Sequence, residues 1–134
     1  MAHESLNSGG LFPLGDKVEN NYFTGDTYLN MIFTDPTPLN AAIGSVTFSP
    51  GARNNWHSHK VGQVLIVTGG EGWYQEEGRA ARTLKTGDVV NIPPNVKHWH
   101  GATKDSWFVH LALTPGETEW MEPVDDGTYG SLGE

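Results

Sequence analysis

The sequence predicts an all-β protein that folds as one antiparallel barrel or sandwich. Short runs of β-branched and aromatic residues alternate with turn residues, and the 134 residues include 17 Gly and 8 Pro spread along the chain. No stretch repeats its apolar residues with the helical period of about 3.6, and no internal repeat is present. The pattern predicts about nine strands, and a barrel is the economical way to cover so many strand edges.

The expected strands follow one another between clear stop signals. In order, they are residues 27–33, 42–48, 54–59, 63–68, 72–75, 80–84, 89–92, 96–100 and 107–113. A Pro-rich turn follows the first strand, Ser49-Pro50-Gly51 closes the second, and Gly69-Gly70 is expected to end the fourth. Glu77-Gly78 indicates a hairpin between the fifth and sixth strands, and Thr86-Gly87-Asp88 indicates the turn that follows.

The two ends of the chain look different from the strand-rich middle. Residues 1–21 are polar and rich in Gly and Asn, so they are expected to form an N-terminal arm, with residues 22–134 as the single domain. The tail from Thr114 is expected to be loop-like, apart from a short aromatic element at residues 119–121.

Composition excludes several classes of function. The formal net charge of −8 argues against nucleic acid and against an anionic membrane surface as partners. The chain has no cysteine, which removes disulfide scaffolds, thiolate metal sites and cysteine nucleophiles. Neither a secretory signal nor an apolar run long enough to span a bilayer is visible. A protein of the reducing cytoplasm that acts on a small molecule is the simplest interpretation.

Five of the six histidines lie between residues 57 and 110. His57 and His59 are two apart, as are His98 and His100, and side chains two apart on a strand point to the same face, roughly 6.5–7 Å apart. Two imidazoles at this spacing can both reach one ion at about 2.0–2.2 Å. A lone strand histidine is usually a surface or hydrogen-bonded core residue, but two such pairs with His110 nearby indicate a metal site.

The position of His110 depends on a strand register. If residues 98–100 and 108–110 form a hairpin, His110 lies beside His98 on the same face, with His100 opposite Phe108. A slip of one residue would turn His110 outward.

Two sequence motifs resemble those of the cupin family. The first combines Gly51, His57-x-His59, Gln63 and Gly69, and the second combines Gly87-Asp88, Pro93, Asn95 and His98. The resemblance covers roughly residues 25 to 125 and implies a small antiparallel jelly-roll β-barrel with a metal ion inside. Carried over by position, it implies the metal ligands His57, His59, Gln63 and His98. It also implies one divalent transition metal ion per chain, manganese first, with iron, nickel, cobalt or zinc as alternatives.

Two positions depart from the family pattern. Cupins commonly have Gly where this chain has Asn95, and Asn tolerates the left-handed backbone that such a turn needs. They commonly have Glu where this chain has Gln63. Three neutral histidines and a glutamine would leave a divalent ion its full charge, so the ion should bind less tightly and act as a stronger Lewis acid. The alternative is that Gln63 is only a polar residue beside a three-histidine site.

Longer runs are similar to a subgroup of small bacterial cupins. They include residues 45–53, 56–59, 62–68, 87–90, 97–102, 110–112 and 119–124. The subgroup contains manganese-dependent hydroxynitrile lyases, and other members are linked by name to carboxymuconolactone decarboxylase. The resemblance implies a carbon–carbon lyase that splits a cyanohydrin into an aldehyde and cyanide. Histidine titrates near neutrality, so the two histidines not used as ligands are candidates for proton transfer, His110 as the base and His100 as the partner that meets the leaving group. The alternative for His100 is that it orients a metal ligand.

Other side chains are candidates for the substrate pocket, with plain core packing as the alternative. They are Val46, Phe48, Trp56, Leu65, Phe108 and Thr114. Arg53 precedes the first histidine pair and is interpreted as structural, with a clamp for a substrate carboxylate as the alternative.

Three other functions remain open at this point. A cupin dioxygenase would use a similar pocket with a three-histidine iron site, and a decarboxylase or isomerase would need the same Lewis acid and base. A non-catalytic small-molecule-binding cupin would hold the ion for structure alone. Small cupins commonly pair through their sheets, so a homodimer or homotetramer is expected, with residues 1–33 as a possible exchanged edge.

Overall fold

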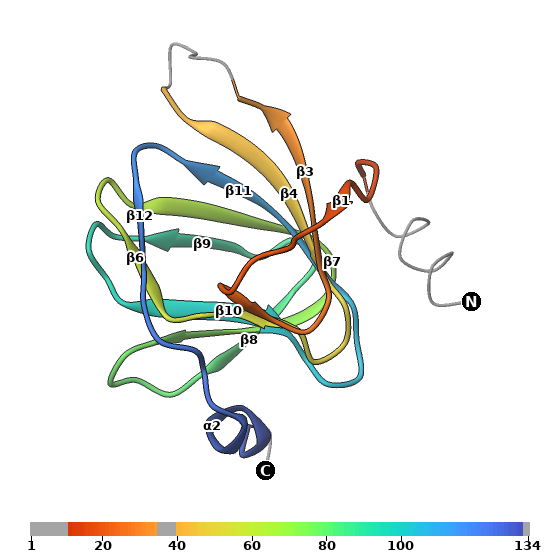
Figure 1. Ribbon diagram of the computed structural model, residues 1–134, viewed down its shortest axis with the longest axis vertical. Coiled ribbons are helices and arrows are strands. Elements are labelled where there is room, and N and C mark those ends of the chain that lie inside the picture. Colours follow the sequence, from red (N-terminus) through yellow and green to blue (C-terminus); the bar gives the residue numbers. More distant parts are fainter. Residues whose placement is uncertain (1–10, 35–39, 133–134) are drawn as a thin grey trace.

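The computed structural model describes residues 11–34 and 40–132 and shows a curled antiparallel sheet (Figure 1). Its strands are β1 (Asp16–Lys17), β2 (Phe23–Thr24), β3 (Thr27–Phe33), β4 (Ala42–Phe48), β5 (Arg53–Asn54), β6 (His57–His59), β7 (Gln63–Glu76), β8 (Arg82–Lys85), β9 (Val89–Ile92), β10 (His98–Ala102), β11 (Phe108–Thr114) and β12 (Thr118–Trp120). Neighbouring strands follow the order β1-β3-β4-β11-β7-β10-β5-β2. The predicted all-β antiparallel barrel is confirmed, and the structure adds one short helix, α2 (Asp126–Gly130).

Strand β7 joins the two halves of the barrel. Its first part pairs with β9 and β11, and its second part pairs with β8 and β10. The register of the pairing between β7 and β11 shifts by one residue: Val109 pairs with Gly69, whereas His110 pairs with Val67. One extra residue therefore lies in β7, which forms a β-bulge there. Gly70 has φ +71°, and a Cβ there would lie 1.7 Å from the carbonyl oxygen of Trp107. The prediction that the glycine pair ends this strand is therefore wrong: the glycines let the strand bend and continue.

The expected hairpin between residues 98–100 and 108–110 is also wrong. Strand β10 pairs with β5, β6 and β7, whereas β11 pairs with β4 and β7. The two strands thus follow one another along the same edge of β7, β10 against its second part and β11 against its first, and do not pair with each other. His110 still faces the barrel interior, but it does so from the other half of the barrel.

The N-terminal segment closes the front of the barrel. Strand β1 pairs with β3 and β2 pairs with β5, so two strands that are consecutive in the sequence lie at opposite ends of the strand order. Residues 18–22 therefore cross from one sheet edge to the other (Figure 1). Of the expected arm, residues 1–10 lie outside the described residues, and residues 16–17 belong to the sheet.

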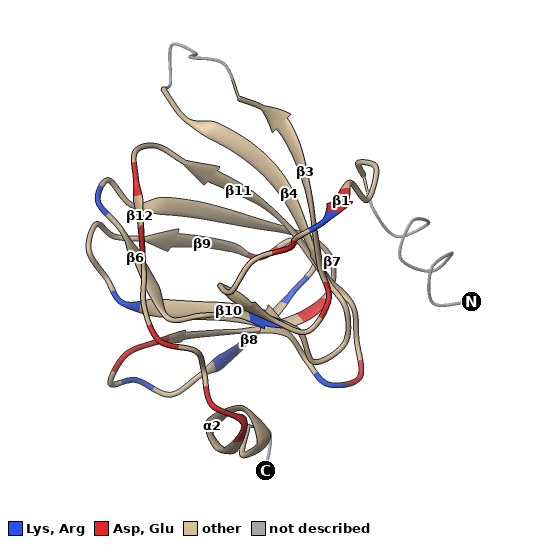
Figure 2. Cartoon of the chain, in the orientation of Figure 1, with Lys and Arg blue, Asp and Glu red and all other residues tan. Residues whose placement is uncertain are grey.

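The core fills the space between the two halves. Its largest fully buried side chains include Phe48, Phe108, Leu65 and Leu84. Charged residues lie mainly at turns and strand ends (Figure 2). No helix within residues 11–34 and 40–132 is long and apolar enough to cross a membrane.

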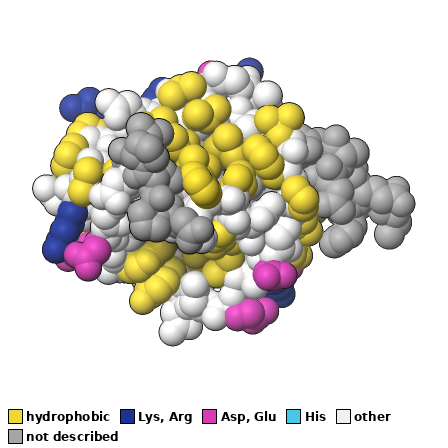
Figure 3. Space-filling model, turned by 90° about the horizontal axis from the view of Figure 1, so that it is seen from above, with side chains coloured by type: hydrophobic (Ala, Val, Ile, Leu, Met, Phe, Trp, Pro, Cys, Tyr) yellow, Lys and Arg dark blue, Asp and Glu magenta, His cyan; other side chains and the backbone are white. Residues whose placement is uncertain are grey.

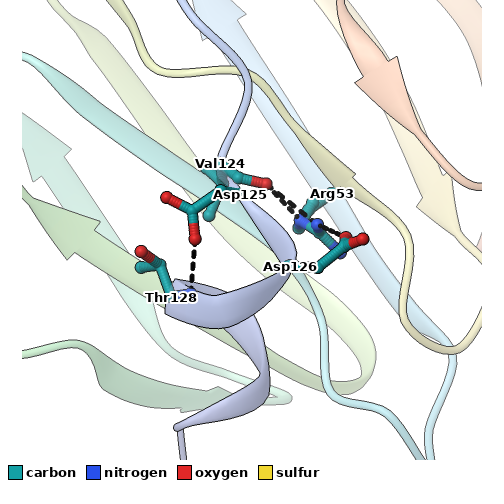
Figure 4. Close-up of polar contacts among 5 residues, drawn as sticks. All are labelled: Arg53, Val124, Asp125, Asp126 and Thr128. Atoms are coloured by element: carbon teal, nitrogen blue, oxygen red, sulfur yellow. Dashed lines mark hydrogen bonds and ion pairs between the residues drawn. The ribbon is translucent and has the colours of Figure 1, made fainter.

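Helix α2 is attached to the barrel by Arg53, as Figure 4 shows. The buried guanidinium donates to the carbonyl oxygen of Val124 from Nε (3.1 Å) and Nη2 (2.8 Å), and Nη2 also lies 2.7 Å from Asp126 Oδ1. The guanidinium carbon of Arg53 (Cζ) lies 4.5 Å from the ring centre of Tyr129. Asp125 caps the helix by accepting from the backbone N–H of Thr128. Arg53 thus has a structural role, as the sequence suggested.

One face of the molecule is apolar. Seen from above, hydrophobic side chains gather in its centre and charged side chains lie toward its margin (Figure 3). The exposed large apolar residues include Met31, Ile32 and Phe33 at the end of β3. Apolar surfaces with a polar rim are typical of interaction sites. The homodimer or homotetramer expected from the sequence stays a prediction.

Candidate functional site

Three histidine rings meet inside the barrel. Strand β6 pairs with β10 so that His57 and His98 are direct neighbours across the ladder. Their ring centres are 4.2 Å apart, and the His59 ring lies 4.9 Å from that of His57 and 5.3 Å from that of His98. All three side chains are buried.

Each of these rings is held by its Nδ1 atom. His57 Nδ1 lies 2.7 Å from the carbonyl oxygen of Asn55, and His98 Nδ1 lies 2.9 Å from that of Val96. His59 Nδ1 lies 2.9 Å from Oγ1 of Thr118. A carbonyl oxygen can only accept, so His57 and His98 carry their proton on Nδ1 and present a lone pair at Nε2. This is the arrangement that outer contacts impose on metal-binding histidines.

Three of the four atoms expected to bind a metal are buried and unpartnered. Within the described residues, His59 Nε2, His98 Nε2 and Gln63 Oε1 have no hydrogen-bond partner. Gln63 donates from Nε2 to Oγ1 of Thr114 at 2.8 Å, which leaves its carbonyl oxygen free. A buried polar atom without a partner costs about 1–3 kcal/mol, so several together indicate a missing partner. These donors fit a divalent transition metal ion.

Burial keeps the same histidines neutral. It lowers the pKa of His57 well below its ordinary value, with the nearby His98 as the next cause. It lowers the pKa of His59 to about 4, again with His98 contributing, and it lowers the pKa of His98 as well. A histidine must be neutral to bind a metal, so the burial that holds the rings together also prepares them as ligands.

His100 offers another possible donor set. One nitrogen from each of His57, His98 and His100 can be chosen so that the three lie within 4.8 Å of one another. However, His100 Nδ1 lies 3.2 Å from His110 Nε2, and both ring nitrogens of His100 lie 3.3 Å from Asn54 Nδ2. Nε2 of His59 has no partner among the described residues, whereas both ring nitrogens of His100 have polar neighbours, so the contacts favour His59 as ligand and leave His100 to a second role.

His100 and His110 form a second imidazole pair beside the ligand cluster. Their ring centres are 4.8 Å apart, and both side chains are buried. Burial lowers the pKa of His110 to about 4, and burial together with His110 lowers the pKa of His100 well below its ordinary value. Near neutral pH each ring is therefore neutral and holds one proton and one lone pair, which suits proton transfer in either direction.

His57 and His59 of the first histidine group line one cavity of about 360 Å³ together with His100 and His110. Its wall is formed by Val18, Asn20, Tyr22, Phe23, Leu29, Met31, Ala42, Gly44, Val46, Asn54, His57, His59, Gln63, His100, His110, Ala112, Thr114, Thr118 and Trp120. These described residues include no Lys, Arg, Asp or Glu. The cavity therefore suits a small, uncharged molecule with an apolar part.

The structure separates the six expected pocket residues. Val46 and Thr114 line the cavity. Phe48, Leu65 and Phe108 belong to the fully buried core instead, because their strands turn these side chains into the packing between the sheets. Trp56 lies outside the wall, and its ring lies 5.5 Å from the Lys97 ammonium.

Sequence reasoning missed an aromatic group on the cavity wall. Tyr22 stacks on Trp120 with ring centres 4.7 Å apart and planes 3° apart, and Phe23 lies 5.8 Å from Trp120. Trp120 in turn lies 4.7 Å from the ring of His57. Tyr22 and Phe23 come from the segment that crosses the front of the barrel. Their only signal in the sequence was the pair of adjacent aromatic residues after a polar stretch.

The motif positions take the conformations expected of the family. Asn95 has φ +65°, so it occupies the left-handed turn where cupins commonly have Gly, and its backbone N–H donates to the carbonyl oxygen of His59 at 2.8 Å. A profile of the cupin domain matches residues 44–118, which is more than half of the chain. The chain belongs to the cupin family.

Two similar proteins are identical to this chain at nearly half of the aligned positions. A protein of Granulicella tundricola, named (R)-mandelonitrile lyase, is 46% identical over 113 residues, which are 81% of this chain and 86% of that protein. The crystal structure of a cupin-like protein from Thermotoga maritima is 45% identical, covers 93% of this chain and 99% of that chain, and superposes with a TM-score of 0.88.

A more distant structure shows the same fold. A conserved-barrel cupin from Rhodopseudomonas palustris has a TM-score of 0.68 at 18% identity, and the match covers 87% of this chain and 81% of that chain. The jelly-roll barrel is therefore retained where most of the sequence differs.

Proposed function

We propose that this cupin is a metal-dependent carbon–carbon lyase that splits a small cyanohydrin into an aldehyde and cyanide. The observation that carries the proposal is the neutral His100–His110 pair in the same uncharged cavity as the unpartnered ligand atoms. The 46% identical relative named (R)-mandelonitrile lyase supports the same reaction class.

His57, His59, Gln63 and His98 would hold one divalent transition metal ion, with manganese as the first expectation and iron, nickel, cobalt or zinc as alternatives. The chemistry that such an ion supplies when bound is Lewis-acid stabilisation of negative charge on a substrate oxygen. The Gln63 amide adds no charge to the three neutral histidines, so this stabilisation would be stronger than in a cupin with a carboxylate at that position.

The two remaining histidines carry the protons. His110 takes the proton of the substrate hydroxyl, and the electron pair of that O–H bond forms the carbonyl of the aldehyde. The bond to the nitrile carbon breaks and its electron pair leaves with cyanide. The protonated His110 passes a proton from Nε2 to Nδ1 of His100 across the 3.2 Å contact, and His100 gives its other proton to cyanide, so both rings end neutral.

The uncharged wall argues against a decarboxylase. Among the described residues, none that lines the cavity is a Lys or Arg that could bind a substrate carboxylate. Arg53, the residue considered for that purpose, is occupied outside the cavity by Val124 and Asp126. A cyanohydrin is neutral and needs no such partner.

The test is cleavage of mandelonitrile by protein loaded with Mn²⁺. Benzaldehyde release is followed by absorbance and cyanide by a colorimetric assay, for each enantiomer separately. The blank is the same protein stripped with EDTA, because mandelonitrile decomposes slowly by itself. We expect release well above this blank and one enantiomer to be consumed faster. Equal rates with and without metal would end the proposal, and elemental analysis of protein purified without added metal would identify the native ion.

A further inference from the structure

Asn54 uses both ends of its side-chain amide on a single residue, His100. Its Oδ1 accepts the backbone N–H of His100 at 2.9 Å, and its Nδ2 lies 3.3 Å from both ring nitrogens of His100. A backbone N–H can only donate, so the amide cannot be flipped, and its NH₂ group must face the imidazole. The NH₂ group of Asn54 therefore packs against the imidazole of His100, equally near to both ring nitrogens.

This contact depends on an unusually close approach of two strands. Strand β5 pairs with β10 at Arg53 and Gly101, and a Cβ at Gly101 would lie 2.6 Å from the Cα of Arg53. Only Gly allows the strands to come this close, which brings the short side chain of Asn54 within reach of His100.

Strand β5 is also fixed by strand β2 and by the C-terminal segment. Strand β2 pairs with it at Phe23 and Asn54, and Arg53 is bonded to the C-terminal segment. Asn54 is buried and lines the cavity, but its polar contacts are with His100 and not with the expected metal ligands.

We propose that Asn54 is a positioning residue, which holds the ring of His100 against His110 and so keeps the two imidazoles at proton-transfer distance. The proposal rests on the proposed function for its catalytic consequence, but the effect on the ring of His100 does not depend on any reaction. A role in folding alone would need only the backbone contact.

Two variants separate these roles. Asn54→Ala removes both contacts, whereas Asn54→Asp keeps an oxygen for the backbone N–H of His100 and replaces the NH₂ donor with an acceptor. We expect both to lower kcat for mandelonitrile by about tenfold or more, with KM changed by less than about twofold. Metal content should stay at the wild-type value. Asn91→Asp, the same change on the exposed face of β9, is the matched control and should leave kcat unaltered.

The second readout is the ¹⁵N spectrum of histidine-labelled, zinc-loaded protein, in which the metal is diamagnetic. The His100 ring signals, identified by comparison with His100→Gln, should move in Asn54→Asp and stay in place in Asn91→Asp. The proposal is overturned if Asn54→Asp keeps wild-type kcat and unmoved His100 signals. Loss of metal from both Asn54 variants would also overturn it, because Asn54 would then act on the ligand cluster. If wild-type protein does not cleave mandelonitrile, the proposed function fails, and the His100 signals alone decide the positioning role.

Discussion

His110 and His100 lie side by side although their strands belong to different halves of the barrel. Nε2 of His110 on β11 is 3.2 Å from Nδ1 of His100 on β10, and the two strands pair with different parts of β7, β11 with its first part and β10 with its second. The curl of the sheet brings the inner faces of the two strands together. The proposed proton relay is thus a product of barrel closure and of no local motif.

Replacing His110 should remove activity without removing the metal. In His110→Ala we expect kcat for mandelonitrile to fall by about 10²–10⁴-fold, because the substrate hydroxyl loses its proton acceptor. The contrast is His59→Ala, which should lose metal and activity together. Kinetics and metal analysis on the same samples check this. An active His110→Ala would show that another group is the base.

Replacing Gln63 with Glu should strengthen metal binding and weaken catalysis. A carboxylate adds one negative charge to the donor set, so we expect Mn²⁺ affinity to rise by about tenfold or more and kcat to fall as the ion becomes a weaker Lewis acid. Competition with a chelator measures the affinity. Gln75→Glu adds the same charge at the other end of β7, where the side chain contacts Trp99 and Arg79, and should leave the affinity unaltered. Weaker binding in Gln63→Glu would show that this side chain is not a ligand.

Removing the Arg53 guanidinium should destabilise the fold. Arg53→Met keeps the apolar stem but leaves the carbonyl oxygen of buried Val124 without its two donors. We expect the free energy of unfolding to fall by about 2–3 kcal/mol in urea denaturation. Asp126→Asn should change it little, because Asp126 is almost fully exposed and solvent screens its pairing with Arg53. Equal losses in both variants would mean that the ion pair, and not the carbonyl contact, holds the helix.

The metal-free protein should lose stability in mild acid. The pKa of His110 and that of His59 are lowered by burial to about 4, whereas an unfolded histidine titrates near 6.5. The unfolded chain therefore binds more protons below about pH 6.5, so the free energy of unfolding is highest above that pH and falls as the pH drops toward 4. For His110 alone the loss between pH 7.5 and 5.0 is about 2 kcal/mol. Urea titrations of metal-free protein at pH 7.5 and 5.0 measure it, and a His110→Phe variant should show a smaller difference.

Much of the local structure follows from the sequence. The strands at residues 27–33, 42–48 and 89–92 end where expected, because each is a short apolar run bounded by Pro or Gly turns. The left-handed turn at Asn95 was also predicted correctly. The expected end of a strand at Gly69-Gly70 failed because glycine can terminate a strand or bend it, and only the neighbouring strand decides which. Helix α2 has little intrinsic helix propensity and rests on its contacts with Arg53.

The sequence by itself determined the strand pattern, the barrel class and the two same-face histidine pairs, because alternation along a strand is a local property. Only the tertiary structure decided which side chains share the cavity. The contact of Asn54 with His100, the stacking of Tyr22 on Trp120 and the approach of His110 to His100 join residues from separate strands and segments. Such contacts depend on how the sheet bends, pairs and closes, and no periodicity within one strand encodes them.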